Sequence, residues 1–373
     1  MDQNSFDPLD TDILPAVRSR PTITDVAKLC GVTPATVSRV LNGKKKFSAS
    51  QAVRDKIIET ARNLGYVPDL SARNLHRRGT HIIGLFASPQ THMAEGINES
   101  LLEGIAEVLH AGGYDVFFEL GANTLENPLP FWRFDGAILL QAPRAETVTE
   151  LDRRCVPYVC VNERVGNPTA FVLADDSMGT SRALDHLAQL GHKKIAYANA
   201  RATYFSHYSV TERYETLLQG VRERGMQLVA GHDVPFSSAA EFLQQTIREQ
   251  QATAVITYDH HIAVMLVGAS PGLGLRIPQD YSLICFNDVF PVALLPPPLT
   301  AVAVSGREMG RIGGDLLLNS LLTPSAKPGK VIRIAEDLIV RGSTAPPTAA
   351  APHQNNASLR AAAGSRAPDR ASL

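Results

Sequence analysis

A short run of hydroxyl side chains followed by an arginine is equipped to contact a polyanion. The run comprises Thr33, Thr36, Ser38 and Arg39. Short hydroxyls hydrogen-bond to phosphate oxygens, and a guanidinium can also bind the edge of guanine through two parallel hydrogen bonds. These residue types therefore indicate nucleic-acid contact, and Arg39 could serve it either by reading a base or by holding a phosphate.

Two short helices joined by a turn would position this run. Thr22 and Asp25 have the spacing at which both side chains cap the free amides of a helix start. Gly31 permits a tight turn, and the pair Thr33-Pro34 is typical of the start of a second helix, over 34–41. The apolar seam between the two helices comprises Val26, Ala27, Val32, Val37 and Val40.

A third helix is expected over 51–64, ending at Gly65. Its apolar face would comprise Val53, Ile57, Ile58, Ala61 and Leu64. This layout is that of a helix-turn-helix, whose second helix enters the DNA major groove. A helical hairpin with a solvated polar face has the same pattern, so the layout alone leaves both interpretations open.

The charge is distributed unevenly along the chain. Residues 18–80 hold 13 Lys/Arg and 4 Asp/Glu, a net charge of +9, whereas the net charge of the whole chain is −1. A concentration of positive charge is expected of a surface that displaces counterions from phosphates.

Beyond Thr80, short β-rich runs alternate with amphipathic helices. The expected strands are 81–87, 114–120, 135–140, 158–162, 170–174, 194–198, 254–258 and 282–286, and the expected helices include 97–111, 179–190, 211–224 and 239–250. Such alternation predicts parallel sheets covered on both faces. The region is too long for one core, so we expect two α/β lobes with a ligand cleft between them.

The composition excludes several classes of protein. The 373 residues are 44% hydrophobic and 20% charged, as in an ordinary soluble protein, and no apolar run is long enough to span a membrane. The first residues lack the apolar segment of a secretory signal, and the four cysteines lack metal-ligand spacing. We therefore expect a cytoplasmic protein with buried thiols and no membrane partner.

Several segments resemble the lactose-repressor (LacI/GalR) family. In residues 21–80 the resemblance lies in TITDVAKLCGVTPATVSRVLNG, LGYVPDLSARNL and GTHIIGLF. It continues through nearly all of 81–343, in VLADDSMGTSRALDHLAQLGHKKIAY, SVTERYETLLQG, AVITYD, IPQDYSLICFND and PPPLTAV. The resemblance implies a small all-α helix-turn-helix head and a two-lobed, periplasmic-binding-protein-like α/β sensor.

The resemblance also implies how DNA is bound. Two chains would pair as a homodimer on a near-palindromic double-stranded operator, and the segment after the head would fold there so that Leu75 wedges between base pairs. An apolar wedge is physically reasonable, because unstacking a base step bends the duplex into wider contact. The expected DNA-binding residues are Thr22, Thr33, Pro34, Ala35, Thr36, Ser38, Arg39, Asn42, Lys44, Lys45, Lys46, Ala72, Arg73 and Leu75.

A small-molecule effector, expected to be a sugar or sugar derivative, would bind between the lobes. The implied effector-binding residues are Ser88, Arg213, Tyr258, Asp259, Asn287 and Asp288. In the family an asparagine is common at the position of Tyr258 and an aspartate at that of Asn287, so the usual sugar clamp is altered here. Asp259 could equally cap the helix that follows it.

An α/β body of this kind could instead belong to a sugar- or nucleotide-processing enzyme with an accessory DNA-binding head. The chain contains no Walker sequence, and His260-His261 has no third ligand at metal spacing. We therefore predict a DNA-binding transcriptional regulator, expected to be a repressor, and not an enzyme, with no metal and no cofactor.

The expected organisation has five parts. They are a disordered extension over 1–20, the helix-turn-helix domain over 21–67, a hinge over 68–79, the two-lobed effector-binding and dimerisation domain over 80–343, and a disordered tail over 344–373.

Overall fold

The computed structural model describes residues 21–41, 49–66, 79–87, 96–119, 134–141, 143–199, 207–231, 238–323 and 329–348. The chain divides into two compact units, Met1–Thr80 and His81–Leu373. The expected extension over 1–20 lies outside the described residues, as does the expected hinge apart from its last residue. Within the described ranges, no helix is long and apolar enough to cross a membrane.

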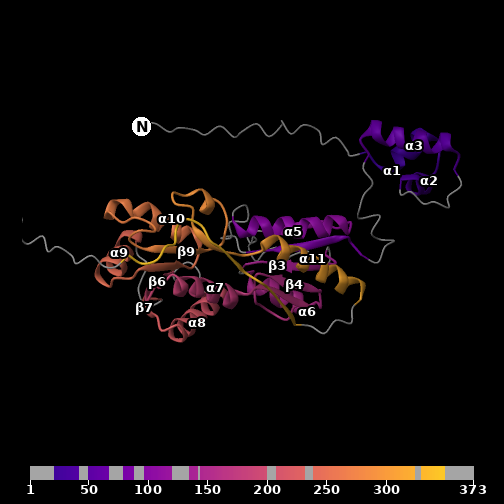
Figure 1. The fold of residues 1–373 in the computed structure, drawn as a ribbon. Coiled ribbons are helices and arrows are strands. Elements are labelled where there is room, and N and C mark those ends of the chain that lie inside the picture. Colours follow the sequence, from indigo (N-terminus) through magenta and orange to yellow (C-terminus); the bar gives the residue numbers. More distant parts are fainter. Residues whose placement is uncertain are drawn as a thin grey trace, which may run out of the picture. The chain divides into compact units, whose positions relative to one another are not determined.

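The first unit contains the three predicted helices, α1 (Ile23–Cys30), α2 (Pro34–Leu41) and α3 (Gln51–Leu64) (Figure 1). Thr22 and Asp25 form a reciprocal capping box at the start of α1. Gly31 and Gly65 end α1 and α3 in the left-handed conformation, with φ of 70° and 67°, which glycine adopts without steric cost. The core of the unit comprises Val26, Ala27, Cys30, Val37, Val40, Ile57 and Ala61.

One residue of the predicted apolar face of α3 points to solvent. Ile58 is 44% exposed, whereas its neighbour Ile57 is completely buried. Successive residues on a helix are rotated by about 100°, so α3 cannot bury both side chains against so small a core. Val32, Val53 and Leu64 pack against this core but are only partly buried.

The second unit contains two sheets of six strands. The first sheet has the order β11-β5-β4-β3-β1-β2, and the second has the order β12-β10-β9-β8-β6-β7. The strands of the first sheet are β1 (Ile82–Phe86), β2 (Asp115–Glu119), β3 (Gly136–Leu139), β4 (Tyr158–Val161), β5 (Ala170–Ala174) and β11 (Lys330–Ile334). The strands of the second are β6 (Lys194–Ala198), β7 (Gln227–Ala230), β8 (Ala254–Thr257), β9 (Ser282–Phe286), β10 (Thr300–Ala303) and β12 (Asp337–Ile339).

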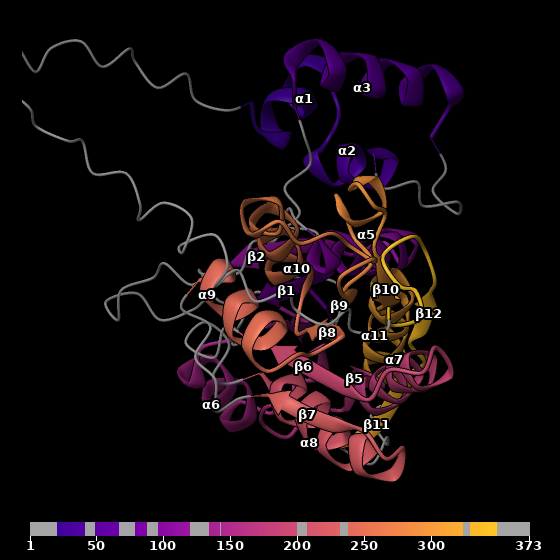
Figure 2. The same ribbon diagram turned by 60° about the vertical axis from the view of Figure 1, so that its left-hand side comes forward.

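Helices cover both sheets and define two lobes (Figures 1 and 2). The first lobe consists of the first sheet with α5 (Ile97–Ala111), α6 (Ala145–Arg153) and α11 (Gly306–Leu322). The second lobe consists of the second sheet with α7 (Asp176–Gln189), α8 (Tyr208–Glu223), α9 (Ala239–Leu243), which continues as a π-helix over Gln244–Glu249, and α10 (His260–Ala269). Each lobe has its own apolar core.

The predicted strands are confirmed within one residue at each end, but the prediction is incomplete. It omits β7, β10, β11 and β12, and the sheets are not wholly parallel, because β12 pairs antiparallel with β10. Both α7 and α8 begin three residues earlier than predicted. The cause is local capping: the side chain of Asp175 accepts a hydrogen bond at the start of α7, and that of His207 does so at the start of α8.

The glycines of α11 allow it to approach α5 closely. A Cβ atom on Gly310 would lie 2.2 Å from the carbonyl oxygen of Leu101, and one on Gly104 would lie 2.1 Å from that of Arg307. Such distances are far inside van der Waals contact, so only glycine fits at these two positions. The two helices therefore pack backbone against backbone, which fixes α11 to the first lobe.

The chain passes between the lobes three times. One residue separates β5 from α7, two separate β10 from α11, and two separate β11 from β12. The three crossovers place Asp175, Asp176 and Glu336 at the boundary between the lobes.

The expected start of the C-terminal tail is too early. The chain remains on the second lobe through residue 348, where Thr344 bonds to His186, Ala345 bonds to His192 and Ser282, and Thr348 donates to the carbonyl of Gln279. The segment holds to the lobe through backbone groups and hydroxyls. Its lack of large apolar residues therefore could not reveal these contacts.

Candidate functional site

The first candidate surface is the outer face of α2. The Oγ1 atom of Thr33 accepts a hydrogen bond from the backbone N–H of Thr36 (3.2 Å), which caps the helix, and the two hydroxyls lie 3.0 Å apart. Val37 and Val40 turn into the core. Pro34, Ala35 and Arg39 are exposed, while Thr36 and Ser38 are half-buried. The predicted run thus lies on one accessible face of a short, capped helix.

Thr22 has a structural role at the start of α1. Its backbone N–H and its hydroxyl donate to the carboxylate of Asp25 at 2.8 and 2.7 Å. These hydrogen bonds hold the pKa of Asp25 below its ordinary value. The other predicted DNA-binding residues, Asn42, Lys44, Lys45, Lys46, Ala72, Arg73 and Leu75, lie outside the described residues.

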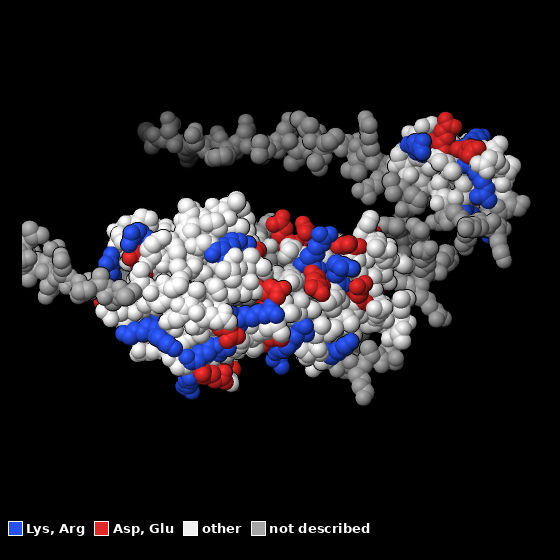
Figure 3. Space-filling view, in the orientation of Figure 1, with Lys and Arg blue, Asp and Glu red and all other residues white. Residues whose placement is uncertain are grey.

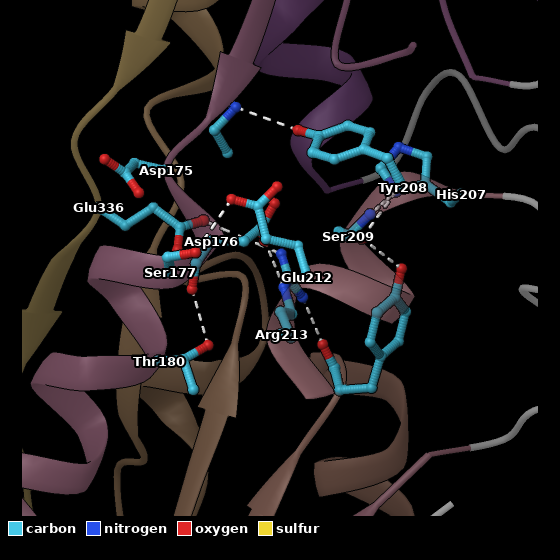
Figure 4. Close-up of polar contacts among 12 residues, drawn as sticks. Asp175, Asp176, Ser177, Thr180, His207, Tyr208, Ser209, Glu212, Arg213 and Glu336 are labelled. Atoms are coloured by element: carbon cyan, nitrogen blue, oxygen red, sulfur yellow. Dashed lines mark hydrogen bonds and ion pairs between the residues drawn. The ribbon is translucent and has the colours of Figure 1, made fainter. Parts of the chain in front are cut away.

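The second candidate site is a buried cluster at the boundary between the lobes, around Arg213 of α8 (Figure 4). Its Nε donates to Asp176 (2.5 Å), and its Nη1 donates to the backbone carbonyl of Tyr258 (2.6 Å). The guanidinium carbon lies 3.9 Å from the ring centroid of Phe286 and 5.0 Å from that of Tyr258. The side chain is therefore held on several sides by the protein itself.

Two completely buried carboxylates accompany this one guanidinium. Asp176 begins α7, and Glu336 lies on the crossover before β12, with Oε1 3.9 Å from Nη2 of Arg213. Burial, reinforced by Asp176, raises the pKa of Glu336 to about 8. Burial opposes the charge of Arg213, yet the two carboxylates outweigh it and raise the pKa of the guanidinium. Arg213 therefore pairs with Asp176, and the raised pKa of Glu336 favours its protonated form near neutral pH.

Tyr258 and Asp259 follow β8 at the carboxyl edge of the second sheet. Asp259 caps α10, because its Oδ1 accepts from the backbone N–H of Ile262 (3.0 Å). The Tyr258 hydroxyl lies 2.8 Å from Ser209 Oγ, and both residues are buried. Of the two roles considered for Asp259, the capping role is therefore present in the structure.

The remaining effector candidates are not joined to this cluster by a described contact. Asp288 forms a two-pronged ion pair with Arg341, at 2.7 and 2.8 Å. Asn287 is half-buried and has a positive φ of 70°, which asparagine tolerates better than most residues. Ser88 lies outside the described residues.

Sequence reasoning missed the polar groups that join the two lobes. Tyr208 donates to Oδ1 of Asn162 and accepts from the backbone N–H of Ala174, both at 3.1 Å. Nε2 of His207 lies 2.8 Å from the backbone carbonyl of Asn162. The paired Asp175-Asp176 directly after an apolar strand was the signal available for the acidic part of this cluster.

One segment that resembles a catalytic motif is structural. Residues 268–272, GASPG, match the letters of a Gly-x-Ser-x-Gly elbow, but Ser270 is buried at the end of α10 and donates to the carbonyl of Leu266. Within the described ranges, no three His, Cys, Asp or Glu side chains gather as a metal site requires.

Both units match known protein families. Residues 22–69 match the model of bacterial regulatory proteins of the lacI family, and residues 184–344 match that of a periplasmic binding protein-like domain. The transcriptional regulator CelR of Thermobifida fusca is 27% identical over 339 residues, covering 87% of this chain and 99% of CelR. The transcriptional repressor CytR of Escherichia coli K12 is 29% identical over 340 residues, covering 87% of this chain and 96% of CytR.

Solved structures share the fold. The Lac repressor dimer bound to operator and the anti-inducer ONPF superposes with a TM-score of 0.71 at 21% identity, covering 88% of this chain and all of that one. A complex of the regulator CelR with cellobiose gives a TM-score of 0.60 at 24% identity, covering 87% of this chain.

Proposed function

Because the chain belongs to the lacI family of bacterial regulatory proteins, we propose that it is a cytoplasmic repressor that binds a near-palindromic operator as a homodimer. We also propose that its DNA affinity is controlled by a carbohydrate bound between the two lobes. Its named relatives are transcriptional regulators, so the enzyme alternative is not retained.

The single observation that best supports DNA binding is the exposed face of α2. Pro34 and Ala35 have no side-chain donor, so their contacts with bases would be apolar, for example with thymine methyl groups. Arg39, which is exposed one turn further along, would supply polar discrimination or hold a phosphate. The hydroxyls of Thr33, Thr36 and Ser38 and the basic loop Lys44–Lys46 would position the helix through phosphates.

The cluster around Arg213 supports the proposal that a carbohydrate effector binds between the lobes. Carboxylates, hydroxyls and a guanidinium suit a polyol, because each can satisfy neighbouring hydroxyl groups in pairs. Neighbouring structures of the same fold contain cellobiose, ribose or glucose. We expect Arg213, Tyr258 and Asp259 to contact the sugar, with Ser88, Asn287 and Asp288 completing the site.

Exposed apolar side chains support a second copy of the chain as the partner. Met265, Phe290 and Leu294 of the second lobe are 49%, 80% and 75% exposed, and the face around α10 carries few charged side chains (Figure 3). On the first lobe, Val116, Phe117 and Phe118 of the edge strand β2 are also exposed. Apolar surface on both lobes is expected where two protomers associate side by side.

The three crossovers suggest how the two activities are coupled. A sugar between the lobes would change their relative rotation, and with it the separation of the two hinges that lead to the heads. Hinge folding on DNA would then gain or lose free energy, typically about 1–3 kcal/mol for such coupling.

Selection from random double-stranded DNA fragments tests the proposed sequence-specific DNA binding. Full-length protein at moderate ionic strength should enrich one near-palindromic sequence, and one of D-ribose, D-glucose or cellobiose should change its affinity for that sequence. No preference for any sequence, with or without these sugars, would overturn the proposal.

A thermal-shift screen of the same sugars tests the effector part, because a ligand that binds only the folded state raises the melting temperature. The shift should shrink in Arg213→Lys and persist in Arg276→Lys, whose arginine is exposed on the same lobe and pairs with Asp280. Equal shifts in the two variants would remove Arg213 from the site.

A further inference from the structure

Hydrogen bonds run without interruption from the first lobe to the hydroxyl of Tyr258. Figure 4 shows the part of this chain from His207 to Ser209 and onward. Nε2 of His207 lies 2.8 Å from the backbone carbonyl oxygen of Asn162, which follows β4 of the first lobe. Nδ1 of the same ring lies 2.7 Å from Oγ of Ser209, and that oxygen lies 2.8 Å from the hydroxyl of Tyr258. The chain of contacts thus begins on one lobe and ends at a proposed effector residue on the other.

The chemistry of the first contact fixes the tautomer of His207. A carbonyl oxygen only accepts hydrogen bonds, so Nε2 must carry the hydrogen, and in a neutral imidazole Nδ1 is then an acceptor. An independent contact agrees: the backbone N–H of Ser209, which only donates, lies 3.4 Å from Nδ1. Two groups of fixed polarity, one at each ring nitrogen, therefore assign the same tautomer.

This tautomer determines the direction of the remaining hydrogen bonds. Because Nδ1 accepts, the Ser209 hydroxyl donates to it, and Ser209 Oγ must in turn accept from Tyr258. Tyr258 thus directs its one hydroxyl hydrogen at Ser209 and presents oxygen lone pairs in other directions. Burial raises the pKa of Tyr258, so the phenol keeps this hydrogen at neutral pH.

We propose that His207 is a specificity-determining residue of the effector site, because it fixes the Tyr258 hydroxyl as a hydrogen-bond acceptor towards the effector. The site then favours a ligand that presents an O–H or N–H group at this position over one that presents an ether oxygen or a fluorine. The inference rests on the proposed function, in which Tyr258 contacts the effector. It also makes ligand choice depend on lobe contact, since Asn162 belongs to the first lobe.

The other described contacts of Tyr258 and the second link between the lobes do not set this polarity. Arg213 binds the backbone carbonyl of Tyr258 and lies over its ring, away from the contact with Ser209. Tyr208 makes a separate link between the lobes, to Asn162 Oδ1. His207 and Ser209 therefore set the direction of the hydrogen bond made by the Tyr258 hydroxyl.

Nuclear magnetic resonance of the full-length protein, labelled with ¹⁵N in its histidines, tests the tautomer without any effector. The signals of His207 are identified by their loss in His207→Gln. At pH 7.5 they should show a protonated Nε2 and an unprotonated Nδ1. The opposite tautomer, or an imidazolium, would overturn the proposal.

Calorimetry with sugars and their deoxyfluoro analogues tests the selectivity. The probes are D-ribose, D-glucose, cellobiose and the analogues that replace one hydroxyl at a time by fluorine, which removes a donor. For the hydroxyl that meets Tyr258, fluorination should weaken binding about tenfold in the wild type. In Ser209→Ala the Tyr258 hydroxyl can turn and donate, so the loss should shrink to about twofold.

Ser177→Ala is the matched control, because this hydroxyl contacts Glu212 and Thr216 in the same cluster but not Tyr258. It should keep the tenfold discrimination, and equal discrimination in Ser209→Ala and Ser177→Ala would overturn the proposal. If none of the sugars binds while His207 has the stated tautomer, the carbohydrate assignment fails and the polarity of Tyr258 is upheld.

Discussion

Replacing Glu336 by glutamine tests the protonation of the buried cluster. The pKa of Glu336 is raised by burial from 4.5 to about 8, so between these values the folded protein holds a proton that the unfolded chain has released. Stability from this group is therefore complete below pH 4.5 and is lost as the pH rises through about 8. At about 1.36 kcal/mol per pKa unit, the loss amounts to at most about 5 kcal/mol.

Glutamine preserves the shape of the protonated acid and cannot ionise. In urea titrations of the full-length protein followed by circular dichroism, Glu336→Gln should match the wild type within about 1 kcal/mol at pH 5 and exceed it by about 2–5 kcal/mol at pH 9. Glu212→Gln is the control, since it removes a neighbouring carboxylate that pairs with Arg333, and it should show no gain at pH 9. A Glu336→Gln variant less stable than the wild type at pH 9 would mean that Glu336 is ionised and paired with Arg213, and would refute the reasoning.

Three further variants test other parts of the molecule. Arg39→Ala should equalise binding to fragments that differ at one base pair, whereas a uniform loss with a shallower salt dependence would assign Arg39 to a phosphate. Leu75→Ala should weaken operator binding at unchanged melting temperature, and unchanged operator affinity would exclude the wedge. Gly310→Ala should lower the free energy of unfolding by about 1–3 kcal/mol in denaturant titrations, because its Cβ would lie 2.2 Å from the carbonyl oxygen of Leu101, whereas Gly268→Ala, whose Cβ meets nothing within 4 Å, should not.

The head could be predicted from the sequence because its signals are local. Thr22 and Asp25 cap α1 three residues apart, Thr33 caps α2, and Gly65 ends α3 where the chain must turn left-handed. Each signal acts within one helical turn, so neighbouring residues suffice to locate it. Ile58 is the exception, since a short run of aliphatic residues does not show which of two neighbours faces the core.

The body was less predictable where packing decides the outcome. The four glycines of α11 weaken its helical pattern, yet its packing against Leu101 and Gly104 requires small residues. Likewise, β11 and β12 gain their partners only from strands far away in the chain, so their sequences carry little local signal.

The polar cluster could be recognised only in part. Arg213 was predicted through resemblance, but its partner Asp176 lies 37 residues away, and Glu336 comes from the end of the domain. His207 and Ser209 were missed because a hydrogen bond from a histidine to a carbonyl of the other lobe leaves no pattern in the sequence. Both carboxylates are completely buried, so which of them keeps a proton depends on the distance to Arg213, 2.5 Å for Asp176 and 3.9 Å for Glu336, and only the fold determines that distance.

The short connection between β11 and β12 has a geometric consequence for any motion of the lobes. Two residues tie the edge of one sheet to the edge of the other, and the other two crossovers leave from β5 and β10, the adjacent strands. The axis of rotation must therefore pass close to this shared edge, where Glu336 lies. Displacement grows with distance from an axis, so the opposite edges, β2 and β7, travel furthest. The segment from the head enters the body at β1, beside β2. If the lobes rotate as proposed, a small angular change at the buried carboxylates therefore produces a larger displacement at the start of β1.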